Sequence, residues 1–325
     1  MRKGFLLIMS FVCLFFSCVI WGLGIWKEKL HPLALDFNSS SIALDPLPAP
    51  SIAHPVLKTA SPSALALSAQ GVIALDLASE TILFTKNEHT PFYPASTVKI
   101  MTALVVRDQF PLDDLVTLTS SDLTISNSIG LQVGETLTVA DLLQALLISS
   151  SNEAAQALAS HHPQGMTAFV DLMNAKADEL NLTTAHFISP EGFDNTEQKI
   201  SAFDLLILSR ALLQDDYLRS IVALDQTTIS NTSGRLYHLI NTNQLFDAHT
   251  IIQTADQSFQ PEVYGIKTGT TPLALEALSS FIRLDSHDFL IVVLESKTRY
   301  NDTVSLLSWL MNNYEWHLAS PHQPN

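Results

Sequence analysis

Hydrophobic residues are distributed unevenly along the chain, and its first segment is uniformly apolar. Residues 4–26 carry no charged side chain, while Arg2 and Lys3 precede them and Lys27 follows. About 20 apolar residues are enough to cross a bilayer as a helix, so residues 1–30 are predicted to form a signal anchor with one transmembrane helix over about 4–26. A cleaved signal peptide is the alternative, but it would have a shorter apolar core and a small-residue cleavage site.

The next segment, residues 31–63, is rich in Pro, Ser and Ala. This composition is typical of an extended, semi-rigid linker, which is expected to hold a domain away from the membrane. A globular domain is predicted from about residue 64 to residue 318, followed by a tail over residues 319–325. The sequence shows no internal repeat.

Within residues 64–318 the hydrophobic pattern predicts strands at both ends and helices between them. Residues 66–77 and 81–85 indicate a hairpin with its turn at 78–80. The later elements are predicted as helices over 96–106, 139–148, 153–159, 166–180 and 203–213, strands over 265–271, 277–284 and 289–295, and a helix over 303–314. This order predicts an α+β domain whose terminal strands meet in one antiparallel sheet flanked by helices.

Charge and cysteine content narrow the range of functions. The formal net charge is −15, which argues against binding to a nucleic-acid backbone. Both cysteines, Cys13 and Cys18, fall inside the apolar segment, so the rest of the chain has no disulfide, thiol nucleophile or thiolate metal site. The histidines lack metal-ligand spacing, so neither a metal nor another cofactor is expected.

One short motif suggests nucleophilic chemistry. Ser96 and Lys99 lie three residues apart in the stretch PASTVKIM. This spacing is about one helical turn, so both side chains would emerge on one face within contact range. A neutral amine there could take the proton of the serine hydroxyl. Alone the pair is weak, because roughly one Ser-x-x-Lys is expected by chance at this length, and a helix cap beside a solvated lysine is the alternative.

Two further motifs strengthen this interpretation. Ser150 and Asn152, in the sequence SSN, fall at a break between two predicted helices, and Lys267, Thr268 and Gly269 lie on a predicted strand. Taken singly, the first could be a helix N-cap and the second could contain an ordinary edge-strand lysine. The order Ser-x-x-Lys, Ser-x-Asn, Lys-Thr-Gly is that of the penicillin-recognising serine acyltransferases.

Longer stretches resemble one family within that group. The segments PASTVKIMTALVV, LLISSSNEAAQALA, FISPEGFD and VYGIKTGTT resemble parts of the D-alanyl-D-alanine carboxypeptidases of low molecular mass. The resemblance covers residues 64–314, which is almost the whole predicted domain. It implies a mostly helical subdomain packed on the antiparallel sheet, with the cleft between them.

The resemblance also implies roles for the motif residues. Ser96 would be the acylated nucleophile and Lys99 its general base. Lys267 would favour the neutral form of Lys99 through like-charge repulsion and would attract the carboxylate of the substrate. Ser150 would relay a proton to the departing amine, and Asn152 would hold the peptide and orient Lys99.

The same resemblance implies how the strand would bind substrate. The backbone amides of Ser96 and Thr270 would form an oxyanion hole. Gly269 would let the substrate lie close to the strand, and the hydroxyls of Thr268 and Thr270 would bind the carboxylate. The chain departs from the family pattern after this motif, because Leu275 occupies a stretch, PLAL, that has no glycine and could alter how the strand leaves the site.

These residues imply a membrane-anchored serine-type D-Ala-D-Ala carboxypeptidase that trims peptidoglycan stem peptides outside the bacterial cytoplasmic membrane, with β-lactams as covalent inhibitors. The alternatives are a D,D-endopeptidase, a β-lactamase on the same scaffold, or a catalytically weak cell-wall-binding module. Glu179 resembles the carboxylate with which some β-lactamases deacylate. It ends a periodic helix, so it is interpreted as structural.

Overall fold

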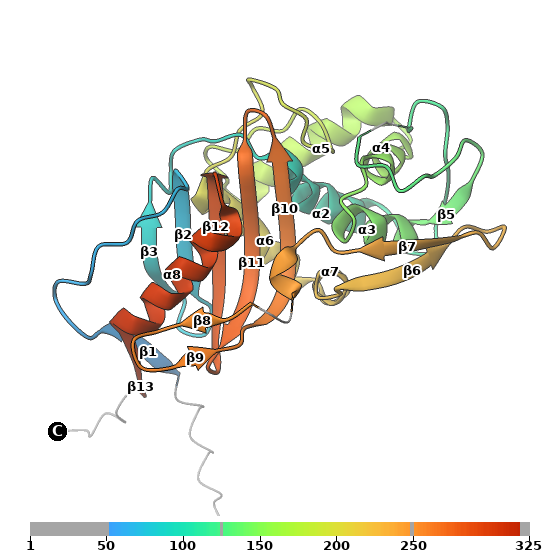
Figure 1. Cartoon of the computed structure of the whole chain (residues 1–325). Helices are drawn as coiled ribbons and strands as arrows, with labels where there is room; N and C mark the ends of the chain where they lie inside the picture. Colours follow the sequence, from blue (N-terminus) through green and yellow to red (C-terminus); the bar gives the residue numbers. More distant parts are fainter. Residues whose placement is uncertain (1–51, 124–125, 248–249, 319–325) are drawn as a thin grey trace, which may run out of the picture. The chain divides into compact units, whose positions relative to one another are not determined.

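An antiparallel sheet forms the centre of the part of the chain that the structure describes. The computed structural model describes residues 52–123, 126–247 and 250–318. The chain divides into two units, residues 1–49 and 50–325, and all described residues belong to the second. The sheet has five strands in the order β10-β11-β12-β2-β3 (Figure 1). Its strands are β2 (Gly71–Asp76), β3 (Thr81–Lys86), β10 (Glu262–Thr271), β11 (Leu275–Leu284) and β12 (His287–Ser296).

The sheet joins the two ends of the domain, which confirms the predicted α+β arrangement. Strand β2 pairs with β12, with Ile73 opposite Val292. Side chains alternate between the two faces of a strand, so Ile73 and Leu75 enter one hydrophobic cluster, while Val72 and Ala74 enter another. Because both faces are covered, these strands are continuous apolar runs in the sequence.

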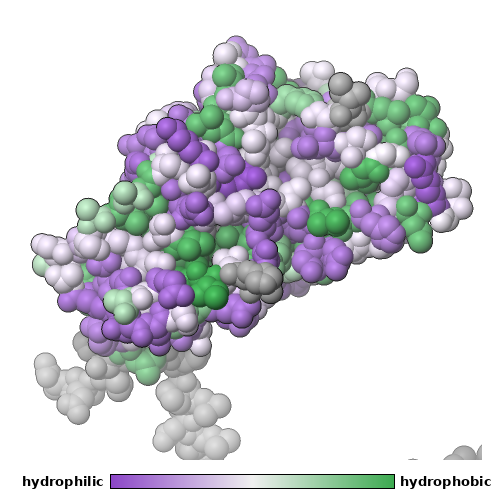
Figure 2. Space-filling model, in the orientation of Figure 1, coloured by the Kyte–Doolittle hydropathy of each residue, from purple (hydrophilic) through white to green (hydrophobic). Residues whose placement is uncertain are grey.

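Helices supply the cover on both faces (Figure 1). Helix α6 (Ala202–Gln214) contacts β2, β11 and β12, and α8 (Arg299–Asn313) contacts β11 and β12 on the opposite face. Leu306, Leu307 and Leu310 of α8 belong to the cluster on that face. The outer surface is mixed: Figure 2 shows many polar residues on this side of the molecule and hydrophobic residues in small separate groups.

The other helices surround α2 (Lys99–Gln109), which follows directly on the 3-10 turn η1 (Ala95–Val98). They are α3 (Val139–Leu147), α4 (Asn152–Ser160), α5 (Gly165–Glu179) and α7 (Asp216–Val222). Helix α2 contacts α3, α4, α5 and α6, and every residue from 99 to 106 is buried. A helix that is enclosed in this way has little amphipathic pattern of its own.

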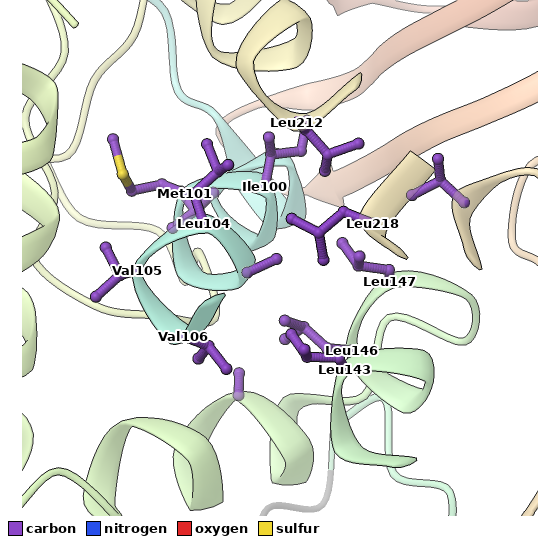
Figure 3. Close-up of a cluster of buried hydrophobic side chains, with 14 of the residues drawn as sticks. Ile100, Met101, Leu104, Val105, Val106, Leu143, Leu146, Leu147, Leu212 and Leu218 are labelled. Atoms are coloured by element: carbon purple, nitrogen blue, oxygen red, sulfur yellow. The ribbon is translucent and has the colours of Figure 1, made fainter. Parts of the chain in front are cut away.

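Side chains radiate from α2 into this enclosure. Figure 3 shows apolar residues of α2 pointing toward α3 and toward leucines of α6 and α7. The labelled members are Ile100, Met101, Leu104, Val105, Val106, Leu143, Leu146, Leu147, Leu212 and Leu218. Because α2 begins inside this hydrophobic core, its first residue, Lys99, is buried there.

Several pairings correct the sequence prediction. Strand β1 (Ala53–Leu57) pairs with β13 (Tyr314–Leu318), so these five residues of the predicted linker belong to the folded part. The predicted last helix ends at Asn313. A hairpin of β6 (Gln226–Ser230) and β7 (Leu236–Ile240) was not predicted, nor was α7. Two short pairs, β4 (Leu115–Thr117) with β5 (Thr136–Thr138) and β8 (Ile252–Gln253) with β9 (Ser258–Phe259), and the 3-10 turn η2 (Gln244–Phe246) complete the elements.

The predicted membrane anchor falls outside the described residues. So do residues 31–51 of the predicted linker and the tail over residues 319–325. Over residues 52–123, 126–247 and 250–318, no helix has the length and apolar character that crossing a membrane requires.

Deleting residues 1–63 is expected to destabilise the domain relative to deleting residues 1–51. The longer deletion removes β1, the hydrogen bond from the Lys58 amide to the Asn313 carbonyl (2.8 Å) and the bond from Trp309 Nε1 to the Ser63 carbonyl (2.7 Å). We expect the free energy of unfolding to fall by roughly 1–3 kcal/mol, measured by urea denaturation. Identical unfolding curves for the two proteins would show that β1 adds nothing to stability.

Candidate active site

The structure places Ser96 and Lys99 in direct contact. Lys99 Nζ lies 3.1 Å from Ser96 Oγ, because the turn η1 runs into α2 without a break. The two side chains differ in access to solvent: Ser96 is 8% exposed, and Lys99 is fully buried. The Ser96 hydroxyl is therefore partly accessible to solvent, while the Lys99 amine that it contacts is not.

Two other acceptors fix the orientation of the amine. Lys99 Nζ donates to Asn152 Oδ1 at 2.7 Å and to the Glu191 carbonyl at 2.8 Å. Both oxygens can only accept, so a neutral amine uses its two N–H bonds on them. In this neutral form the remaining position of the amine is a lone pair, which can accept the proton of Ser96 Oγ, 3.1 Å away. This is the arrangement that a general base requires.

Burial is the main reason why Lys99 can be neutral. Loss of hydration lowers the pKa of Lys99 to about 7, and the negative charge of Glu191 opposes this shift. The sequence analysis expected repulsion from Lys267 to be responsible. Lys267 is itself buried, and its pKa is lowered well below the usual value by burial first and by the charges of Lys99 and Arg299 second. Enclosure by the helices therefore replaces like-charge repulsion as the chief cause of the low Lys99 pKa.

The segment between α3 and α4 contains Ser150 and leads to Asn152, which contacts Lys99. Ser151 caps α4 by accepting from the Ala154 amide at 3.1 Å, so the capping role belongs to Ser151. Ser150 has a φ of 59°, and its buried Oγ has no hydrogen-bond partner among the described residues. Asn152 is held from its other end, where Nδ2 donates to the Ser126 carbonyl at 2.9 Å. The free hydroxyl of Ser150 is chemically suited to pass on a proton.

Strand β10 carries Lys267, Thr268 and Gly269 along an edge of the sheet, where it contacts η1. Lys267 Nζ donates to the Thr268 carbonyl (3.1 Å), and Thr268 Oγ1 lies 2.6 Å from Thr242 Oγ1. A Cβ added to Gly269 would lie 2.9 Å from both Ser96 N and Ala95 Cβ. Only glycine allows the strand to pass this close to the nucleophile.

A second glycine approaches the same peptide from the loop FISPEGFD. A Cβ on Gly192 would lie 2.0 Å from the Ala95 carbonyl oxygen and 3.1 Å from Ser96 N, and the φ of Gly192 is 91°. Ala95 also has a positive φ, 48°. The Ser96 amide is thus held between two backbone segments that have no side chain at the contact, which suits a donor in an oxyanion hole.

Two residues near the site were missed by the sequence analysis. Arg299, the first residue of α8, donates from Nη1 to the Gly269 carbonyl and to Thr270 Oγ1, both at 2.7 Å. Arg299 therefore places a positive charge next to Thr270, whose hydroxyl was predicted to bind the substrate carboxylate. Glu191 is 2% exposed. It lies in the segment FISPEGFD, and no role was predicted for it. The predicted antiparallel order of the last three strands was a usable signal for Arg299, because it brings the end of β12 near the start of β11.

Other predicted positions lie away from this cluster or keep a structural role. The side chain of Glu179 is 65% exposed and pairs with Lys176 at 3.0 Å. Leu275 has a φ of 55°, a conformation that favours glycine, yet it pairs with Thr271 and closes the turn between β10 and β11. Within the described ranges, no group of three or more His, Cys, Asp or Glu side chains could hold a metal ion.

Comparison with known proteins identifies the family. A family profile described as D-alanyl-D-alanine carboxypeptidase, peptidase S11, matches residues 58–298. The chain belongs to this family. The resemblance drawn from the motifs is therefore confirmed.

Individual members of the S11 family show the extent of the similarity. The D-alanyl-D-alanine carboxypeptidase DacF of Bacillus subtilis is 27% identical over 264 residues, which are 78% of this chain and 65% of DacF. A D-alanyl-D-alanine endopeptidase of Pseudomonas aeruginosa is 28% identical over 265 residues, 79% of this chain and 82% of that protein. The crystal structure of the Streptomyces K15 DD-transpeptidase superimposes with a TM-score of 0.68 at 27% identity, covering 77% of this chain and 99% of that one. The chain spans just under two thirds of the length of DacF.

Replacing Gly269 with alanine is expected to slow acylation of this S11 protein by a labelled penicillin about 100-fold, because the new Cβ pushes β10 away from the Ser96 amide. The measurement is the rate of covalent labelling, with circular dichroism to verify the fold. Gly234→Ala is the control: its added Cβ has nothing within 4 Å, and the strain that alanine meets at its φ of 88° falls in the turn between β6 and β7. Gly234→Ala should label at the unaltered rate, and an equally fast Gly269→Ala would refute the close-approach interpretation.

Proposed function

We propose that the protein is a serine-type D-Ala-D-Ala carboxypeptidase that removes the terminal D-alanine from peptidoglycan stem peptides. The observation that carries the proposal is the 3.1 Å contact between Ser96 Oγ and the fully buried amine of Lys99, which two acceptor oxygens hold in place. Membership of the S11 family supports the same reaction.

Acylation follows from this contact. Ser96 Oγ bonds to the carbonyl carbon of the penultimate D-alanine while Lys99 takes the hydroxyl proton. The peptide C–N bond then breaks, and the proton passes to the amine of the leaving D-alanine, for which the unpartnered Ser150 hydroxyl is available. Water hydrolyses the ester and restores the Ser96 hydroxyl. The Ser96 amide, between its two glycine contacts, stabilises the oxyanion of both steps.

The substrate binds along the free edge of β10. An extended peptide can add to an exposed strand edge through backbone hydrogen bonds, and Gly269 leaves room for it next to Ser96. Its terminal carboxylate then lies toward Thr270, where Arg299 supplies the positive charge. Lys267 is buried with a strongly lowered pKa, so Arg299 is the better permanent cation for this task.

β-Lactams are expected to acylate Ser96 by the same chemistry. The leaving amine of a penicillin stays tethered to the acyl group and obstructs the hydrolytic water, so the adduct persists longer than a peptide acyl-enzyme. A β-lactamase would need a carboxylate directed at that water. Glu179, the residue that suggested this alternative, is exposed and paired with Lys176.

A D,D-endopeptidase is the second candidate function. The similarity to the Pseudomonas aeruginosa endopeptidase extends over 82% of that protein, a larger share than for DacF. The two activities use the same nucleophile and base, and they differ in whether the leaving amine belongs to a free D-alanine or to a cross-linked stem peptide.

We further propose that residues 4–26 anchor the protein in the bacterial cytoplasmic membrane, with the catalytic domain on the outer side. The length and uncharged character of this segment support the proposal. Peptidoglycan lies outside the membrane, so a tethered domain would be kept near its substrate.

The reaction is tested by its product. The full-length protein is expected to release free D-alanine from a pentapeptide ending in D-Ala-D-Ala, and Ser96→Ala should reduce this release by at least about 1,000-fold. Mass spectrometry of the digest gives the measurement. Faster cleavage of a cross-linked dimer than of the pentapeptide would make the endopeptidase the better assignment, and cleavage by Ser96→Ala at the wild-type rate would exclude Ser96 as nucleophile.

The anchor is tested by extraction from membranes. The full-length protein should remain in the membrane pellet after a carbonate wash, because a spanning helix is not released by loss of electrostatic contacts. A protein lacking residues 1–51 should be found in the supernatant. Release of the intact full-length protein by carbonate would contradict the proposed anchor.

A further inference from the structure

Glu191 is a buried acidic residue that the acylation steps described above do not use. Glu191 is 2% exposed, and its Oε1 has no hydrogen-bond partner among the described residues. The other side of the carboxylate is in contact with Ser189 and with the Glu191 backbone amide. A carboxylate that is buried with one oxygen unpaired is costly, so its position calls for a compensating interaction.

The loop that carries Glu191 is fixed against α2. Consecutive carbonyls of this loop accept hydrogen bonds from α2: the Pro190 carbonyl accepts from Thr102 Oγ1 at 2.7 Å, and the Glu191 carbonyl accepts from Lys99 Nζ at 2.8 Å. On the next residue, Gly192 packs against the Ala95 carbonyl. The backbone of Glu191 is therefore held against the Lys99 amine, and the residue is almost fully buried there.

An internal amide holds the loop from its other side. Gln198 Oε1 accepts from the amides of Ile188 and Ser189, both at 3.0 Å, and Gln198 Nε2 donates to the Phe193 carbonyl at 3.1 Å. Gln198 is itself buried. The backbone is therefore held on both sides of Glu191.

The charge of Glu191 acts on Lys99 and the charge of Lys99 acts on Glu191. Burial raises the pKa of the Glu191 carboxyl, and Lys99 opposes this shift. Two buried groups of opposite charge titrate as a pair. The ionised carboxylate favours the protonated amine and so opposes the effect of burial on Lys99.

Other charged groups nearby are placed differently. Lys267 on β10 is a second buried cation, and the charges of Lys99 and of Arg299 on α8 both act on it. Glu153 on α4 is occupied, with Oε2 accepting from the Ile129 amide at 3.1 Å and Oε1 accepting from the Ser128 hydroxyl. Asp194 accepts from the Leu273 amide at 3.1 Å and is exposed. Glu191 is thus the acidic group whose charge Lys99 senses most.

We propose that Glu191 is a positioning residue for the catalytic lysine: its buried carboxylate, in the residue whose carbonyl holds the Lys99 amine, acts through its charge on that amine and sets the pH range over which Ser96 is acylated. The proposal rests on the function proposed above for Ser96 and Lys99. An anionic Glu191 favours protonated Lys99, so the carboxylate keeps the enzyme less active on the acidic side and more responsive to pH than an isolated buried lysine would be.

The test is the pH profile of the full-length protein with Glu191→Gln. The amide removes the charge but keeps the shape of the side chain, so the acidic limb of the rate of acylation by a labelled penicillin should move about one pH unit lower. At a pH one unit below the wild-type midpoint, acylation should become about five-fold faster. A variant that only loosened the structure would lose rate at every pH, and that result would refute the proposal.

Two further variants serve as a control and as a second test of the Glu191 carboxylate. Glu179→Gln removes the same charge from an exposed position, where solvent screens it, and its midpoint should stay at the wild-type value. Ser189→Ala keeps the carboxylate but removes a hydrogen bond that favours its anionic form, so its midpoint should move in the same direction as that of Glu191→Gln by a smaller amount. If Glu191→Gln does not fold, the Ser189→Ala profile decides, and an unmoved midpoint overturns the proposal.

A titration without turnover separates this proposal from the proposed function. In protein labelled with ¹³C at lysine Cε, the resonance that is lost in Lys99→Met reports the amine directly. Its titration midpoint should fall in Glu191→Gln and Ser189→Ala even if the wild-type protein does not react with penicillin, an outcome that would refute only the proposed function. An unchanged midpoint in both variants would refute the role of Glu191 while leaving the acylation chemistry intact.

Discussion

The burial of one lysine amine is the constraint on which the rest of the site depends. An ordinary lysine is protonated near neutral pH and cannot act as a base. Lys99 escapes this because α2 begins inside the hydrophobic core formed with α3, α4, α5 and α6, and the loss of hydration lowers its pKa to about 7. The apolar residues of these helices, far from the reacting atoms, therefore contribute to the chemistry as much as to the stability of the fold.

A second constraint is the close approach of three separate chain segments. The Ser96 amide belongs to η1, and it is bordered by Gly269 of β10 and by Gly192 of the loop before α6. The helical region carries Ser96 and Lys99, the proposed nucleophile and base, while the sheet has the edge along which a peptide is proposed to bind. The site exists only where these parts meet, so packing across the sheet and helix boundary is a requirement for function.

The sequence predicted the parts of this arrangement that are local. Ser96 and Lys99 are one turn apart, and the continuous apolar runs of β2 and β12 reflect burial on both faces, so pattern alone sufficed. The cause of the low Lys99 pKa could not be predicted, because it depends on four helices that are distant in the chain. The contacts of Arg299 and Glu191 depend on the tertiary fold for the same reason. Strand β1 was assigned to a linker because its residues are mostly exposed and its partner lies at the opposite end of the domain.

The pairing of β1 with β13 also fixes where the domain begins and ends. Ala53 lies opposite Leu318, and paired strands are about 5 Å apart. Two ends so close to one another allow a whole domain to be inserted into a surface loop of a host protein, or to be circularly permuted with a connection of a few residues. The new ends could then be placed at an exposed turn such as the one around Gly234, while the segments that meet at Ser96 would remain uncut.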